Sequence, residues 1–71
     1  MIEEKITNEI EKLATYEAIC KNALYELQLS KPNQLMDFER KKIESVLSRM
    51  FENEKDFLIE NPTDYFDINN N

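Results

Sequence analysis

The 71-residue sequence contains no glycine and only two prolines, Pro32 and Pro62. Glycine supplies the positive-φ positions that tight hairpins, phosphate-binding loops and many helix caps require. Its absence disfavours β-rich architectures and glycine-loop nucleotide sites, and it favours long uninterrupted helices. The two prolines lie where such helices would have to end.

Histidine is also absent, and Cys20 is the single cysteine. One cysteine cannot form a disulfide within the chain, and without histidine the ordinary zinc sites are excluded. Cys20 falls on the apolar side of a predicted helix with no histidine to activate it, so we interpret it as a buried structural thiol. We expect no catalytic residues, no metal and no cofactor, and therefore no enzyme.

Long hydrophobic runs are missing as well, since none exceeds three residues, as at 57–59. The acidic start at residues 1–5 leads into no apolar segment. No signal peptide and no membrane-spanning segment are therefore expected. A single unpaired cysteine fits a reducing compartment, so we expect a cytoplasmic protein.

Apolar residues recur at helical spacing in two segments, 2–29 and 33–60. The stripe of the first segment comprises Ile2, Ile6, Ile10, Leu13, Tyr16, Cys20, Leu24 and Leu27. The wider stripe of the second comprises Leu35, Met36, Ile43, Val46, Leu47, Met50, Phe51, Phe57 and Leu58. Good helix formers fill the other positions, so both segments are predicted to be helices.

The prolines define how these helices are connected. Lys31 precedes Pro32 and is pushed out of the α region, while Pro32 suits the first turn of a second helix. Asn61 precedes Pro62 and ends that helix for the same reason. A short linker folds two helices back as antiparallel neighbours. We predict an all-α fold: an antiparallel two-helix hairpin over 1–61 and a short, partly disordered acidic-aromatic tail over 62–71.

Two helices of this length cannot cover each other's apolar stripes. Chains this short rarely enclose enough apolar surface to be stable alone. We therefore expect a homodimer in which two hairpins form a four-helix bundle. The side chains predicted to be buried are Leu13, Leu24, Ile43, Leu47 and Met50.

Charge is unevenly distributed within a net charge of −6. Residues 1–30 carry −3, residues 31–51 carry +2 and residues 52–71 carry −5. A hairpin places both termini at one acidic end and the loop at the other. An antiparallel dimer would set each acidic end beside the partner's basic segment, so electrostatics favour that arrangement.

The basic segment contains the only cluster of positive charge, Arg40, Lys41 and Lys42. It is a candidate partner-binding patch, and a third functional hypothesis is RNA binding through residues 40–49. Acidic residues interleave with the patch and the net charge is negative, so we interpret it as a solvated helix face. Direct nucleic-acid binding is not expected.

The tail offers a second candidate partner-binding site, formed by Tyr65, Phe66 and Ile68. Asp64 and Asp67 flank these side chains, as in a peptide that docks in a basic, apolar groove. The alternative is that the aromatic side chains fold back and cap the open end of the bundle. The sequence leaves both interpretations open.

Glu17 occupies a position within the first apolar stripe. One interpretation is a buried acid with a shifted pKa or a polar group that sets register. The other, which we favour, is a carboxylate that reaches the rim and pairs with Lys21 one turn later, or with an arginine such as Arg49 on the neighbouring helix.

These features predict a small non-enzymatic protein-interaction module, an adaptor, regulator or inhibitor of another protein, built as a helical-hairpin oligomer. The alternative is an acidic nucleic-acid mimic that blocks a DNA- or RNA-binding protein. Mimicry predicts binding that collapses as salt rises, whereas docking of apolar surfaces is far less sensitive to salt.

Overall fold

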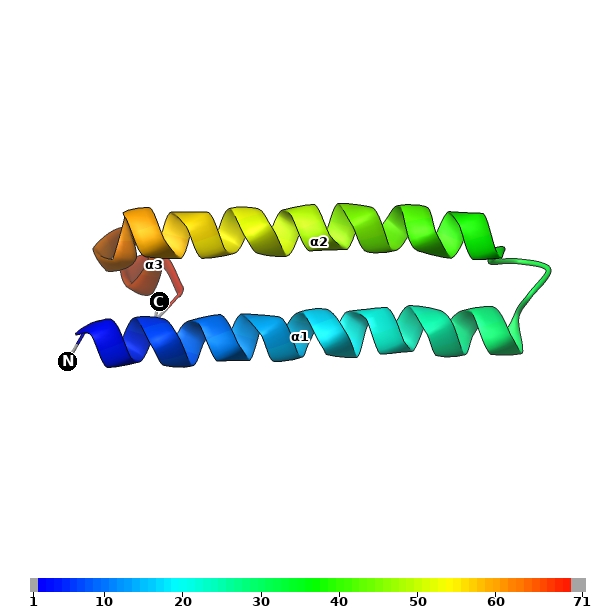
Figure 1. Cartoon of the computed structure of the whole chain (residues 1–71), viewed down its shortest axis with the longest axis horizontal. Coiled ribbons are helices and arrows are strands. Elements are labelled where there is room, and N and C mark those ends of the chain that lie inside the picture. The colour runs from blue at the N-terminus through cyan, green and yellow to red at the C-terminus, as the bar shows by residue number, and fades with distance from the viewer. Residues whose placement is uncertain (1, 70–71) are drawn as a thin grey trace.

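The computed structural model describes residues 2–69, which form three helices and no strands: α1 (Ile2–Ser30), α2 (Asp37–Glu60) and α3 (Pro62–Asn69). The two long helices pack side by side in antiparallel directions, and α3 lies at the end opposite the loop (Figure 1). The molecule measures 47 × 20 × 15 Å. The predicted all-α antiparallel hairpin is confirmed. No helix in the described part of the chain is long and apolar enough to cross a membrane.

The second long helix begins at Asp37, later than the predicted residue 33. The backbone N–H groups of Gln34 and Leu35 both donate to the Lys31 carbonyl, so the segment after Pro32 makes one isolated turn. Met36 then adopts an extended conformation (φ −83°, ψ 161°) that interrupts the helical path.

The start of α2 is held by a side chain in its first turn. Met36 donates its backbone N–H to Glu39 Oε1 over 3.0 Å, which satisfies a donor that the helix itself leaves unpaired. Leu35, in the turn just before, is buried with 7% of its surface exposed. The longer connection therefore turns an apolar side chain inward at the loop end of the hairpin.

Asn61 and Pro62 end α2 as predicted, but they also begin α3. The N–H of Asn61 still donates to the Phe57 carbonyl, while φ of −136° and ψ of 63° take Asn61 out of the helix. The Asn61 carbonyl then accepts the N–H of Tyr65, the first such bond of α3. Proline suits the first helical position because its missing N–H would have no partner there. Most of the predicted tail is thus helical, and residues 70–71 lie outside the described residues.

The core sits at the open end of the hairpin, where one side chain from each helix meets the others. Leu13, Leu58 and Tyr65 form a buried cluster, and Leu58 is fully enclosed. Half-buried side chains surround the cluster: Ile6, Ile10, Phe51 and Phe66. The third helix is therefore part of the fold and contributes an aromatic ring to the core.

The predicted set of buried side chains is correct only in part. Leu13 is buried, and Leu24 and Leu47 are half-buried. Ile43 and Met50 are 39% and 58% exposed, so the prediction was wrong for both. A single neighbouring helix covers a narrower arc than the apolar stripe of α2, which leaves these two side chains on its flank.

Candidate functional site

One flank of α1 continues from its contacts with α3 towards the loop. The Lys5 ammonium lies 5.2 Å from the centre of the Phe66 ring, and Lys12 lines the groove beside that ring. Lys5, Lys12 and Ile19 follow each other at intervals of two helical turns, so they lie along the same side of α1. Ile19 extends this side beyond the contacts with α3.

The matching flank of α2 is identified in the same way. The ring centres of Phe57 and Tyr65 are 6.1 Å apart, which places Phe57 on the side that carries α3. Met50 and Ile43 follow at intervals of two turns towards the loop. The flanks of α1 and α2 on this side of the hairpin are therefore both apolar.

We call the surface between α3 and the loop on this side the apolar face. Its large side chains are Tyr16, Ile19, Leu27, Ile43, Val46 and Met50. All six are between 39% and 58% exposed. Scattered apolar residues on a surface need no explanation, whereas large contiguous apolar patches are typical of interaction sites.

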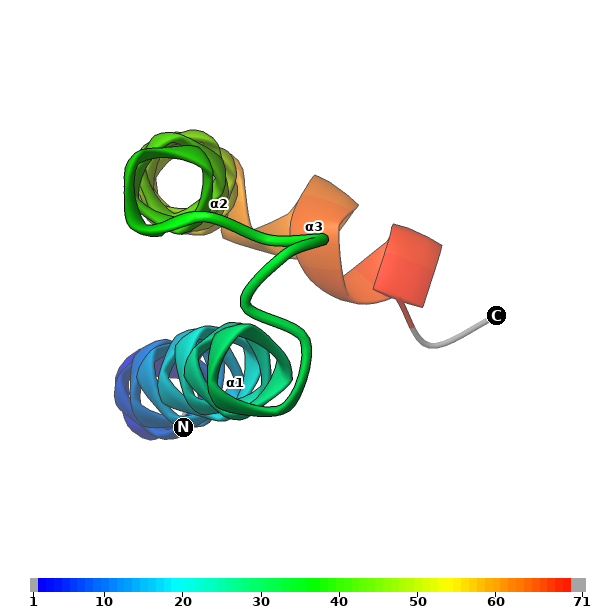
Figure 2. The same ribbon diagram turned by 90° about the vertical axis from the view of Figure 1, so that its right-hand side faces the viewer.

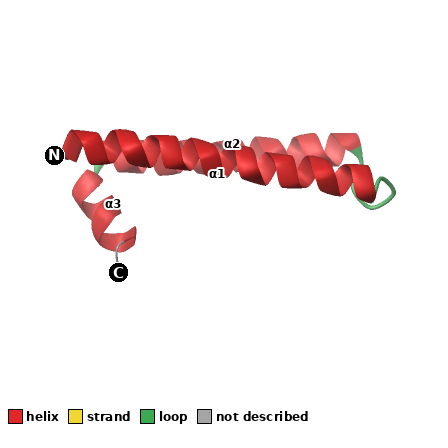
Figure 3. Ribbon diagram, turned by 90° about the horizontal axis from the view of Figure 1, so that it is seen from below, coloured by secondary structure: helices red, strands yellow, loops and turns green. Residues whose placement is uncertain are grey.

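The third helix bounds the apolar face at the open end. It projects to one side of the two long helices and leaves them at an angle instead of lying along them (Figures 2 and 3). The groove at its base is lined by Glu9, Lys12, Leu13, Tyr16, Phe51, Glu54, Tyr65 and Phe66. Tyr16 and Phe51 are the lining residues closest to the loop, so α3 closes one end of the face and leaves the remainder uncovered.

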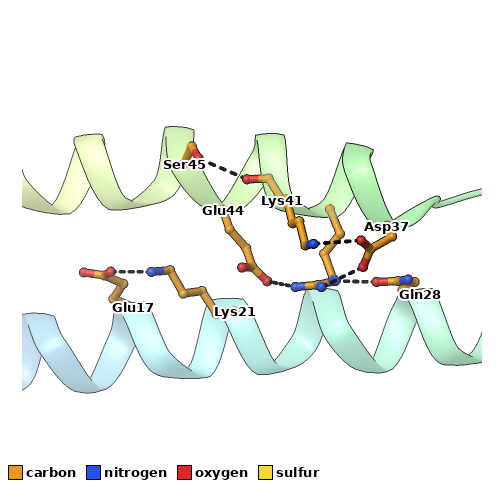
Figure 4. A network of polar contacts seen from close by, with 8 residues as sticks. Glu17, Lys21, Gln28, Asp37, Lys41, Glu44 and Ser45 are labelled. Carbon is orange, nitrogen blue, oxygen red and sulfur yellow. Dashed lines mark hydrogen bonds and ion pairs between the residues drawn. The ribbon is translucent and has the colours of Figure 1, made fainter.

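The opposite flank of the hairpin carries a network of polar side chains, of which Figure 4 labels Gln28, Asp37 and Glu44, and its central residue is Arg40. Exposed apolar side chains also occur on this flank, among them Tyr25 (52%) and Ile59 (57%). The Arg40 guanidinium donates to the carboxylates of Glu44 and Asp37 on its own helix and to the side-chain oxygen of Gln28 on α1. It also lies 5.5 Å from the centre of the Tyr25 ring. Its side chain is only 14% exposed, so Arg40 joins the two long helices near the loop.

Glu17 lies further along this polar flank. Its carboxylate pairs with Lys21 at 2.8 Å, as predicted, and accepts a hydrogen bond from the Ser48 hydroxyl of α2 at 3.2 Å. The hydrogen bond from Lys21 is the main cause that lowers the pKa of Glu17, and burial opposes it. Glu17 is thus a charged link between the helices that stays ionised near neutral pH.

The structure separates the three predicted basic residues. Arg40 is engaged within its own chain, while the exposed Lys41 pairs with Asp37 at 3.0 Å. The hydrogen bonds from Lys41 and then Arg40 lower the pKa of Asp37. Lys42 is exposed. Two of the three charges are therefore already balanced by neighbouring carboxylates.

The three predicted tail residues are also placed differently from one another. Tyr65 is 3% exposed, within the core of its own chain, and burial raises its pKa. Phe66 is half-buried, with its ring perpendicular to that of Tyr65 at 5.5 Å between centres. Ile68 is exposed. The aromatic pair thus closes the open end, which is the capping arrangement considered from the sequence.

Sequence reasoning missed that one side of the second stripe stays exposed on the flank that α3 bounds. The signal was present in the width of the second stripe, because Val46 and Met50 fall on one side of its centre while Leu47 and Leu58 fall on the other. What the sequence does not specify is the side from which α3 projects, and hence which flank it bounds.

Within residues 2–69, no group of three or more Cys, Asp or Glu side chains is placed to hold a metal ion. Comparison of the chain with protein-family models, with curated proteins and with solved structures found no match.

Proposed function

We propose that the protein is a non-enzymatic interaction module of the cytoplasm, an adaptor, regulator or inhibitor that works by covering its apolar face. In its functional form two hairpins associate as a homodimer, and their long helices form a four-helix bundle. The observation that supports this proposal is the apolar face, with six large side chains that remain about half exposed.

Association would gain free energy by covering the apolar face. Fully burying one such side chain gains about 1.5–3 kcal/mol, so covering the exposed half of six gains roughly 5–9 kcal/mol per protomer. Loss of translational and rotational freedom costs about 4–15 kcal/mol for the pair. The gain from two protomers is of the same size as this cost or larger, so the face can drive association.

The second candidate is an acidic nucleic-acid mimic. It is supported by the −2 of residues 2–15 and the −5 of residues 52–69, which the antiparallel fold brings together in the open half of the hairpin. The two candidates use different surfaces, since the mimic would bind through exposed carboxylates and the interaction module through apolar side chains.

Affinity capture from a lysate of the organism that encodes the chain tests the proposal. The bait is the full chain, compared with Met50→Lys on the apolar face and with Ile59→Lys as a matched control. Ile59 is 57% exposed, almost as much as Met50, and lies away from the flank of Phe57. A partner that persists at about 0.5 M salt and is lost only with Met50→Lys is the expected result, because this variant disrupts the apolar face on which the homodimer that binds the partner depends.

Two results would contradict this proposal. A partner that both lysine variants retain and that high salt removes would favour the acidic mimic. If the chain retains no protein in either salt condition, the proposed interaction with another protein is wrong.

A further inference from the structure

We propose that the apolar face is covered by a second copy of this chain, packed antiparallel. In this pair α3 of each copy contacts the loop end of the other copy and limits how far the two hairpins overlap. In this dimer only the loop halves of the two hairpins overlap. The inference rests on the proposed function, because it names the occupant of the face through which the module acts.

The exposed area is sufficient for such a dimer. The accessible surface of the chain is 5545 Å². A compact monomer of this length exposes roughly 4,700 Å². Each partner in a standard specific interface buries about 800 Å², which is close to the excess of this chain. The surface that the chain exposes beyond that of a compact monomer is therefore of the size that one partner of a standard interface buries.

The direction of α3 determines the orientation. Two hairpins packed face to face in parallel would bring both projecting α3 helices to the same end, where they would hold the faces apart. In an antiparallel pair the two helices stand at opposite ends. Each then meets the loop of the partner, so the arrangement closes after two copies.

The position of α3 also determines the register. Its neighbours extend along α1 only as far as Tyr16, so residues 16–30 remain for the partner. At a rise of about 1.5 Å per residue this leaves roughly 20 Å of α1 in the overlap. The symmetry places α1 against α1 of the partner, with Ala23 near the two-fold axis, where a small side chain permits close approach.

Charge supports the same arrangement. The acidic segment 52–69, which includes α3, would face the partner's loop, where Lys31 is exposed. In a parallel pair the acidic ends of both copies would instead face each other. Electrostatic complementarity therefore agrees with the steric argument, although it comes from different residues.

Sedimentation equilibrium of the full chain tests the occupant. We expect a dimer whose dissociation constant rises at least tenfold with Met50→Lys and stays within about twofold with Ile59→Lys. Circular dichroism confirms that both variants remain helical. Equal weakening by the two variants would overturn the assignment to the apolar face. A wild-type chain that stays monomeric at about 0.1 mM would overturn the second copy as occupant.

Distances between spin labels test the orientation and the register. The label is placed at Glu4→Cys in a Cys20→Ala background, on an exposed residue far from the overlap. The staggered antiparallel dimer predicts about 60 Å between labels, full antiparallel overlap predicts about 40 Å, and a parallel pair predicts less than about 25 Å. Either of the two shorter distances would contradict the end-stop role of α3.

Failure of this inference can be distinguished from failure of the proposed function. A monomeric chain that still captures a foreign protein through Met50 would leave the interaction module intact and remove only the second copy. A dimer with the expected label distance that captures no other protein would support the inference and remove the adaptor role.

Discussion

Leu58 is the side chain on which the core depends most, because it is fully enclosed by residues of all three helices. Leu58→Ala should lower the free energy of unfolding by about 2–5 kcal/mol, since it removes apolar contacts and leaves a cavity. The adjacent Ile59→Ala is the control and should change it by less than about 0.5 kcal/mol, because Ile59 is exposed. Urea denaturation followed by circular dichroism measures both. Similar losses would show that burial at the open end is not the source of stability.

Glu17 gives the stability a dependence on pH. Its pKa in the folded state lies below the ordinary 4.5, mainly because Lys21 donates a hydrogen bond to the carboxylate. The stabilisation is therefore present above pH 4.5 and is lost as the pH falls through the folded-state pKa. The free energy of unfolding should decrease between about pH 6 and pH 3, and Glu17→Gln should decrease less over that interval. Parallel profiles for the two proteins would show that the ion pair contributes nothing.

At the scale of elements, α3 is attached chiefly through Tyr65. Burial is the main cause that raises the pKa of its hydroxyl above the ordinary 10.0, with Glu9 adding to the effect. The stabilisation that Tyr65 gives is complete below pH 10.0 and is lost as the pH rises through the folded-state value. In an ultraviolet titration of tyrosine ionisation, the step of Tyr65 should lie above pH 10.0. Tyr65→Phe should remove that step, and its persistence in the variant would show that it does not belong to Tyr65.

Periodicity was sufficient to predict α1 and α2, because each has an apolar stripe several turns long. The predicted start of α2 was wrong because Pro32 indicated a first helical turn near residue 33. In the structure an isolated turn ends at Leu35, and the hydrogen bond from the Met36 N–H to Glu39 then holds the start of the helix at Asp37. The same rule that assigned Pro32 to a first helical turn applies to Pro62. The tail was nevertheless not predicted to be a helix, because it is short and polar. Its helix is stabilised by the burial of Tyr65 against residues that are distant in the sequence.

At the scale of the whole molecule, the sequence predicted too little core for a lone hairpin but not where the uncovered surface lies. That location depends on which flank α3 bounds, and no local pattern encodes the direction in which a helix leaves its neighbour. The sequence suggested one basic cluster at residues 40–42. In the structure Arg40 is separated from the two lysines because it donates a hydrogen bond to Gln28 across the hairpin.

The proposed dimer should respond moderately to salt. Apolar contacts supply most of its affinity, while the acidic segment around α3 faces the partner's Lys31. Raising the salt concentration from about 0.05 M to about 0.5 M should increase the dissociation constant several-fold. Lys31→Ala should reduce this response, and Lys42→Ala is the matched control at a second exposed lysine. Sedimentation at both salt concentrations measures the effect, and an unchanged response in Lys31→Ala would place the partner's loop elsewhere.

The contact between Lys5 and Phe66 joins residues from nearly opposite ends of the sequence. The two long helices can pair progressively from the loop towards the open end, and each further turn that pairs closes only a short additional length of chain. Docking of α3 instead has to wait until both distant ends of the hairpin are in place, so it should be the last event of folding and the first of unfolding. Native-state hydrogen exchange should therefore show the Tyr65 amide, bonded to the Asn61 carbonyl, opening at a lower free energy than the amide of Leu13. The same late step would complete the binding surface, so a chain that has just folded its hairpin would not yet have a boundary that selects its partner's orientation.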